Sequence, residues 1–134
     1  LLVTTARLDG FRIWETASGR QHPQAWPDDD ARMASFLPGG RRVAWTGEVG
    51  GLRLAGADKG APVGSLLALL DGKAGLCIAS NGTAAVVGDA KAITSRMSCA
   101  IGSARLPFEV CAERLLRPTL VHELLTGDDA WLEP

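Results

Sequence analysis

The sequence predicts an all-β fold of short antiparallel strands, followed by a short helical segment at the C-terminal end. Three observations carry this expectation. Apolar residues alternate with polar ones in short runs bounded by glycine-rich turns, which is typical of strands with one buried face. One strand-and-turn unit also recurs along the chain. After about residue 104 the apolar spacing changes to that of helices.

The composition allows one globular domain and argues against two classes of partner. The chain has 134 residues, of which 46% are hydrophobic and 22% are charged, as in ordinary globular domains. Its formal net charge of −1 offers no broad field for a phosphate backbone or an anionic lipid surface. The longest apolar run, 65–70, is too short to span a bilayer. We therefore expect neither nucleic acid nor a membrane as a partner.

The cysteines and the first residues bear on the setting of the protein. Cys77, Cys99 and Cys111 lack the Cys-x-x-Cys spacing of a metal site, and their odd number favours reduced thiols and a cytoplasmic location over a disulfide framework. Cys77 and Cys111 are expected to be small core residues and not reactive thiols. The chain begins in strand-like sequence at Leu1, without Met. We expect a fragment of a longer protein.

One unit of sequence recurs with a constant offset. The run Gly-Phe-Arg-Ile from Gly10 aligns with Gly-Leu-Arg-Leu from Gly51, and Gly19 aligns with Gly60, so both pairs differ by 41 positions. In each copy a glycine turn leads into a strand whose apolar residues alternate around an arginine. Before the second copy, 32–47 reads as strand, Pro-Gly-Gly turn and strand. Three consecutive strands there predict a meander.

A third, weaker copy follows, with strands expected at 66–70, 76–79 and 83–87, and 92–103 could supply one more strand pair. A period near 40 built from short strands is typical of propeller blades, in which each small sheet buries its faces by stacking on its neighbours. The sequence therefore predicts a partial β-propeller of about three antiparallel blades. The expected divisions are the end of a first blade (1–20), a second blade (21–62), a third, degenerate blade (63–103) and a helical C-terminal tail (104–134).

These blades resemble those of the WD40-repeat family through the segments LDGFRIWETASG and SFLPGGRRVAWTGEVGGLRLAGADKG. Trp14-Glu15 stands where the family has its Trp-Asp dipeptide, and Ala55-Gly56 and Val87-Gly88 replace this dipeptide in the later copies. His22 is a loose counterpart of the family's Gly-His element. The resemblance covers roughly residues 1–90 and implies degenerate blades. Other propeller families, including quinoprotein-like ones, and a small β-sandwich are alternatives, and the repeat offset favours a propeller.

The C-terminal tail predicts two short helices. After Pro107, apolar residues follow helical spacing with Arg and Glu between them. Pro118 fits a first turn but not a helix interior, so the helices are expected to meet near Arg117. Gly127 is expected to end the second helix. Val121-His122-Glu123 is better explained as the polar face of that helix than as a catalytic pair, and the apolar stripe is expected to cover a blade edge or dock a neighbouring domain.

No segment carries a recognisable chemical motif. Asp28-Asp29-Asp30 lacks the alternating ligand spacing of a calcium loop and predicts a solvated loop between strands. The glycine-rich segment 47–51 lacks the Gly-Lys-Ser/Thr ending of a phosphate-binding loop and predicts a turn. His22 and His122 lie in no nucleophile or metal motif. We therefore assign no catalytic, cofactor-binding or metal-binding residue and expect no cofactor.

The tryptophans separate core candidates from contact candidates. Trp14 and Trp45 end or centre strands and are expected in the core. Trp26, flanked by prolines and the acidic run, is expected to be exposed in a loop and is the best contact residue. The predicted interaction surface consists of Trp26, His22, Asp28, Asp29 and Asp30.

Three blades do not close a ring, since typical propellers have four or more. An open stack leaves apolar faces and strand edges in water. Missing blades of a longer chain, or another copy of this chain, are expected to complete the stack. The sequence thus predicts a non-catalytic scaffold for protein–protein interaction, the C-terminal fragment of a larger multidomain protein. The alternative is a hydrolase or a ligand-binding propeller that uses loop residues around His22–Asp30.

Overall fold

The computed structural model describes residues 1–6, 10–23, 31–47, 51–69 and 72–127, and this part of the chain is mostly β. The elements follow one another as β1 (Leu2–Ala6), β2 (Gly10–Trp14), β3 (Met33–Phe36), β4 (Arg42–Thr46), β5 (Leu52–Gly56), β6 (Pro62–Leu69), β7 (Ala74–Ala79), β8 (Ala84–Gly88), α1 (Ala90–Thr94), β9 (Ser98–Ile101), β10 (Ala104–Pro107), α2 (Glu109–Leu115) and α3 (Leu120–Thr126).

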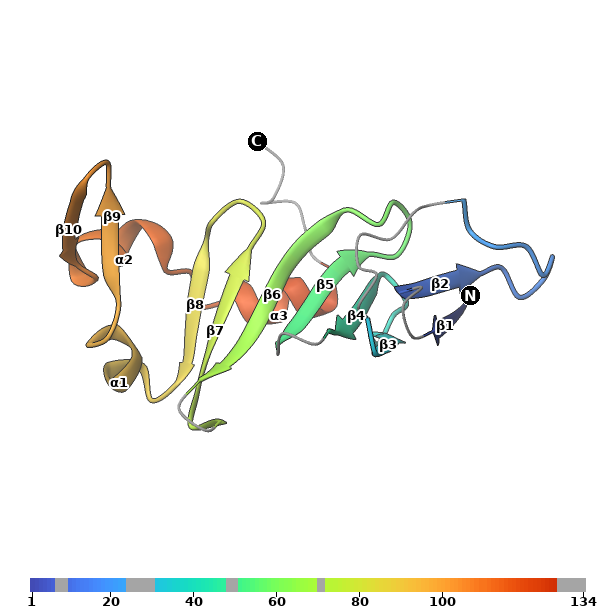
Figure 1. Ribbon diagram of the computed structural model, residues 1–134, viewed down its shortest axis with the longest axis horizontal. Coiled ribbons are helices and arrows are strands. Elements are labelled where there is room, and N and C mark those ends of the chain that lie inside the picture. Colours follow the sequence, from blue (N-terminus) through green and yellow to red (C-terminus); the bar gives the residue numbers. More distant parts are fainter. Residues whose placement is uncertain (7–9, 24–30, 48–50, 70–71, 128–134) are drawn as a thin grey trace.

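The described strands form three antiparallel sheets (Figure 1). Six strands, β3 to β8, pair in sequence order as one meander, and β1–β2 and β9–β10 are separate hairpins. The division expected at 62/63 falls within β6, which pairs with β5 on one side and with β7 on the other. The described residues are mostly β, as predicted, but none of their sheets closes on itself, so a propeller is not shown.

The repeat seen in the sequence is also present in the strand pairing. In the β1–β2 hairpin Val3 lies opposite Ile13, and in the β4–β5 hairpin Ala44 lies opposite Leu54. Each residue of the second pair follows its counterpart by 41 positions, and the neighbouring pairs match in the same way. Because a slip of one residue would turn every side chain to the other face, the shared register makes the two hairpins equivalent units.

The turns that close the two units are equivalent as well. Gly19 and Gly60 have φ angles of 65° and 64°, in the left-handed region that a glycine adopts without steric cost. The N–H of Gly19 donates to the carbonyl of Glu15 at 2.8 Å, and the N–H of Gly60 donates to the carbonyl of Gly56 at 3.0 Å. Sequence and backbone therefore repeat together from strand to turn.

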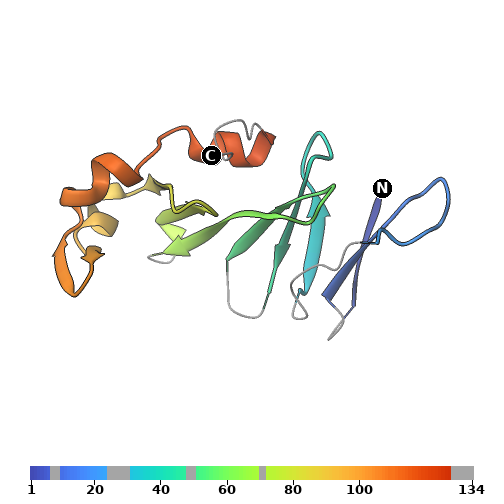
Figure 2. The ribbon, with the colours of Figure 1, turned by 90° about the horizontal axis from the view of Figure 1, so that it is seen from above.

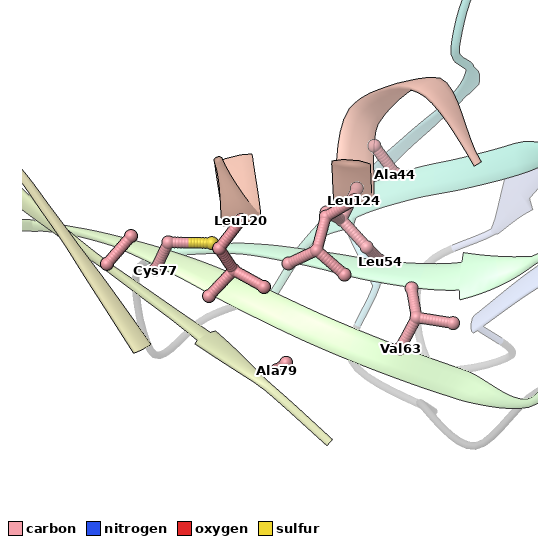
Figure 3. Packing of buried hydrophobic residues seen from close by; sticks show 8 residues of the cluster. Ala44, Leu54, Val63, Cys77, Ala79, Leu120 and Leu124 are labelled. Atoms are coloured by element: carbon pink, nitrogen blue, oxygen red, sulfur yellow. The ribbon is translucent and has the colours of Figure 1, made fainter. Parts of the chain in front are cut away.

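One face of the six-stranded sheet is covered by α3, and we call it the helix face (Figure 2). Ala44 and Leu54 point to this face because strand residues alternate in direction and both belong to the cluster that packs under the helix. Leu120 and Leu124 of α3 are fully buried in this cluster, with Leu124 beside Ala44 and Leu54, and Leu120 beside Cys77 (Figure 3). The helix thus covers the centre of a sheet face, whereas the sequence predicted that it would cover an edge or dock a domain.

The opposite face is partly covered by the β1–β2 hairpin, and we call it the hairpin face. Val43 and Trp45 of β4 point to this side and pack with Phe11 and Ile13 of the hairpin. The ring centroids of Phe11 and Trp45 are 5.1 Å apart, within the range of favourable aromatic pairs. The first repeat unit therefore stacks on the second.

The two predicted C-terminal helices are confirmed. The segment between α2 and α3 contains Arg117, which donates from Nε and Nη2 to the Glu123 carboxylate at 2.7 and 2.8 Å. These hydrogen bonds, with one from Thr119, lower the pKa of Glu123. Gly127 ends α3 with a φ of 78°, as predicted. The strand pair expected over 92–103 begins later, at β9, because α1 precedes it.

The prediction of reduced thiols is wrong for two of the three cysteines. Cys99 of β9 and Cys111 of α2 form a disulfide across a sequence separation of 12 residues. The β9–β10 hairpin reverses the chain, so α2 returns beside β9 and the two Cα atoms lie 6.4 Å apart, a usual spacing for a disulfide. Cys77 is buried under α3 as predicted, and this burial raises the pKa of its thiol to about 11.

Candidate functional site

Of the predicted interaction residues, the structure describes only His22. The other four, Trp26, Asp28, Asp29 and Asp30, lie outside the described residues. His22 follows the first repeat turn, and its backbone N–H donates to the carbonyl of Ile13 at 2.8 Å. The imidazole is half-buried, and its Nδ1 atom has no hydrogen-bond partner among the described residues.

His22 lines a polar pocket of about 470 Å³ where five parts of the chain meet. Arg42 at the start of β4, Asp58 of the second repeat turn and Gly127 at the end of α3 line the same pocket. None of these partners could be found from the local sequence, because they come from segments far from His22 in the chain. The 41-residue offset was the one signal that related the two repeat turns.

The buried arginine of this pocket anchors the helix. Arg42 is 4% exposed, and its Nε donates to the carbonyl oxygen of Leu124 at 3.3 Å. A cation at the C-terminal end of a helix also interacts favourably with the helix dipole. Burial lowers the pKa of the Arg42 guanidinium, and the negative charge of Asp58 opposes this shift. The arrangement explains how α3 is held on the sheet.

A larger and apolar pocket, of about 550 Å³, opens on the helix face. Leu52 and Leu66 form its floor, and Val121 at the start of α3 forms a wall. Ala68 and Gly75 lie on the adjoining strands, and their small size leaves the space open. A pocket lined mainly by apolar side chains is suited to an apolar group of a partner and not to polar chemistry.

The hairpin face also has an open half, over β6 and β7. The β1–β2 hairpin contacts the sheet at β3, β4 and β5, and a pocket of about 410 Å³ lies beside Trp45. Ser65 and Ile78 line this pocket, and Leu76 on the same strand as Ile78 is half-buried. On both sheet faces, part of the apolar surface is thus not covered by α3 or by the β1–β2 hairpin.

The outer face of the β1–β2 hairpin is the third open surface. Leu2 is 53% exposed and lies opposite Trp14 across the two strands. Trp14 is half-buried, and its Nε1 donates to the Oγ1 of Thr4 at 2.9 Å. Trp45 is buried as predicted, whereas Trp14 presents part of its indole at the surface.

Comparison with known proteins identifies no relative. No protein-family model, no curated protein and no solved structure matches the chain. Among the described helices, none is long and apolar enough to cross a membrane. The functional assignment therefore depends on the repeat and on the three open surfaces.

Proposed function

We propose that the chain is a non-catalytic, WD40-like repeat scaffold that binds protein partners through its open sheet faces. The observation that carries the proposal is the stacking of one repeat unit on an equivalent one. In repeat proteins each unit buries its apolar faces only against neighbours. A unit whose apolar face is uncovered can therefore bind a further β-sheet surface.

The extent of the open apolar surface supports this function. Exposed apolar patches beyond the ordinary background mark interaction sites in soluble proteins. Here Leu76 and Ile78 on the hairpin face are half-buried, and Val87, next to the apolar pocket of the helix face, is 48% exposed. The strands β3 to β6 have the number and order expected of one four-stranded propeller blade, and we keep the partial propeller as part of the proposal.

The disulfide changes one expectation about the setting of this scaffold. Disulfides persist in oxidising compartments and are rare in the cytosol. A cytoplasmic location was expected because the thiols were expected to be reduced. The Cys99–Cys111 disulfide removes that reason. We therefore propose the scaffold function without assigning it to the cytoplasm.

Partner capture with matched surface variants tests the proposal. The purified chain is immobilised beside the double variant Ser65→Asp/Ile78→Ser, which alters two residues of the hairpin-face pocket, and the control Ile101→Ser, whose side chain is 58% exposed away from that face. Proteins that the wild type and the control retain and the double variant loses would support the scaffold. Identical protein sets on all three chains, with each chain folded by circular dichroism, would contradict it.

A further inference from the structure

The contact between the two repeat units indicates how two molecules of this chain associate. We propose that Trp14 on the outer face of the β1–β2 hairpin of one molecule inserts into the apolar pocket on the helix face of a second copy. The two molecules then bind head to tail. This inference rests on the proposed function, because it names one partner of the scaffold and the surfaces that bind it.

The offset of 41 residues shows which faces belong together. Phe11 and Ile13, on the inner face of the hairpin, correspond to Leu52 and Leu54 on the helix face of the sheet. In the folded chain, this face of the first unit packs on the hairpin face of the second unit. The helix face of the second unit is thus the surface that would contact a next unit.

The outer face of the hairpin is the matching surface. Its residues Thr4 and Trp14 correspond to Trp45 and Ala55, which lie on the hairpin face of the sheet. This is the type of face on which an equivalent unit already packs inside the chain. Repeating the internal contact once more, between molecules, brings the outer face of one hairpin onto the helix face of another molecule.

The helix α3 leaves the required part of the helix face open. Leu124 covers Leu54, which is fully buried, but Leu52 is only half-buried and lines the pocket of about 550 Å³. Leu52 is the counterpart of Phe11, the residue that contacts Trp45 within the chain. The uncovered part of the helix face therefore contains Leu52, and the equivalent position in the first unit, Phe11, makes the aromatic contact inside the chain.

The contact inside the chain and the proposed contact between molecules place their large and small side chains at different positions, and in each contact the sizes are complementary. Inside the chain, Phe11 meets the large Trp45, and Ala55 beside it is small and buried. Between molecules, the smaller Leu52 would meet a face on which Thr4 replaces the tryptophan and Trp14 replaces the alanine. The indole of Trp14 thus fills the space left by the smaller side chains of Leu52 and Thr4, and the pocket provides an apolar environment for it.

The two surfaces differ, so the association is heterologous. Head-to-tail contacts of this kind do not close by a two-fold axis, and a dimer formed in this way still has one free surface of each type. We expect the average mass to rise steadily with concentration and not to stop at a dimer. Because α3 occupies the other half of the helix face, the contact buries less than the internal one and is expected to be weak.

Two complementary variants test the proposal. Trp14→Ala lacks the inserted side chain but keeps the pocket. Gly75→Val fills the pocket and keeps Trp14, and a Cβ at position 75 meets no atom closer than 3.5 Å, so the sheet is expected to fold. Ala68→Leu is a second pocket-filling variant, and Ile101→Ser is a control outside both surfaces. All chains are checked by circular dichroism and then by sedimentation equilibrium.

Each single variant is expected to stay monomeric where the wild type and Ile101→Ser gain mass. An equimolar mixture of Trp14→Ala with Gly75→Val or Ala68→Leu is expected to form a one-to-one dimer and no larger species, because only one intact contact remains. A wild type that is monomeric throughout, or variants that still associate alone, would overturn the inference. Neither result affects the proposed function, which is tested on the hairpin face by Ser65→Asp/Ile78→Ser, two positions outside the pocket of the helix face.

Discussion

The two repeat units have the same backbone and are covered by different elements. Ile13 of the first unit and its counterpart Leu54 of the second are both fully buried. Ile13 packs on the hairpin face of the sheet, whereas Leu54 packs under α3. The repeat pattern thus specifies that this face must be buried, and the rest of the chain decides whether a sheet or a helix covers it.

The comparison also shows that the stack is asymmetric. At one end α3 covers much of the helix face, as a capping element does in repeat proteins. At the other end the hairpin presents Leu2, which is 53% exposed, and a half-buried Trp14. One end of the stack is therefore capped, and the other has the composition of a contact surface.

Removing the side chain that caps the second unit should have the largest effect. Leu124→Ala removes a fully buried side chain over Leu54, and truncations of this kind cost about 2–5 kcal/mol. Amide exchange should accelerate at Leu54 more than at Ile13, which α3 does not cover. Urea unfolding and hydrogen exchange measure both effects, with the half-buried Leu125→Ala as the control. Equal loss of protection at Leu54 and Ile13 would contradict separate covers.

Two glycines distinguish the covered part of the helix face from the open part. A Cβ at Gly64 would lie 2.6 Å from the carbonyl oxygen of Ile78 and 3.0 Å from Leu124, whereas a Cβ at Gly75 meets nothing closer than 3.5 Å. Gly64→Ala is expected to lower the free energy of unfolding by about 1–3 kcal/mol, and Gly75→Ala to change it little. Chemical denaturation of the two variants gives this difference, and similar costs would argue against an open pocket beside Gly75.

The two repeat turns should respond alike to substitution. Gly19 and Gly60 have nearly the same positive φ, and an L-residue in this conformation costs about 1–2 kcal/mol. Gly19→Ala and Gly60→Ala are therefore expected to lower the free energy of unfolding by similar amounts, and Asn at either position by less, since Asn tolerates the left-handed region. A cost confined to one turn would show that the units differ.

The smallest expected effect lies outside the repeat, at the salt bridge that links the interhelical segment to α3. The hydrogen bond from Arg117 lowers the pKa of Glu123. A carboxylate with a lowered pKa in the folded state stabilises that state above its unfolded pKa, and this contribution is lost as the pH falls through the folded pKa. Glu123→Gln should reduce the drop in melting temperature between neutral and acidic pH, while the control Glu113→Gln, at an exposed position of α2, should not.

Much of the fold could be predicted from local pattern. The alternation around Arg12 and Arg53 located two equivalent strands, and Pro118 with Gly127 located the helix boundaries. These features depend on residues close together in the sequence. The assignment of strands to sheets depends on distant pairing, so the continuous sheet across β5, β6 and β7 could not be read from the spacing.

The candidate surfaces were less predictable for the same reason. Val121, 69 positions after Leu52, lines the same pocket, and no local motif relates the two residues. The odd number of cysteines and the lack of metal-type spacing favoured reduced thiols, whereas Cys99 and Cys111 meet through a hairpin and a helix. Trp14 was expected in the core because it ends a strand, but it lies on the outer face of the hairpin, on the side away from Ile13.

Cross-strand contacts measured by nuclear magnetic resonance test most directly whether the chain contains two equivalent, stacked units. We predict backbone contacts between Val3 and Ile13 and, at the same register, between Ala44 and Leu54. Contacts between the rings of Phe11 and Trp45, whose centroids lie 5.1 Å apart, should join the two units. A register in either hairpin that departs from the 41-residue offset, or the absence of the Phe11–Trp45 contact in the folded chain, would contradict the account.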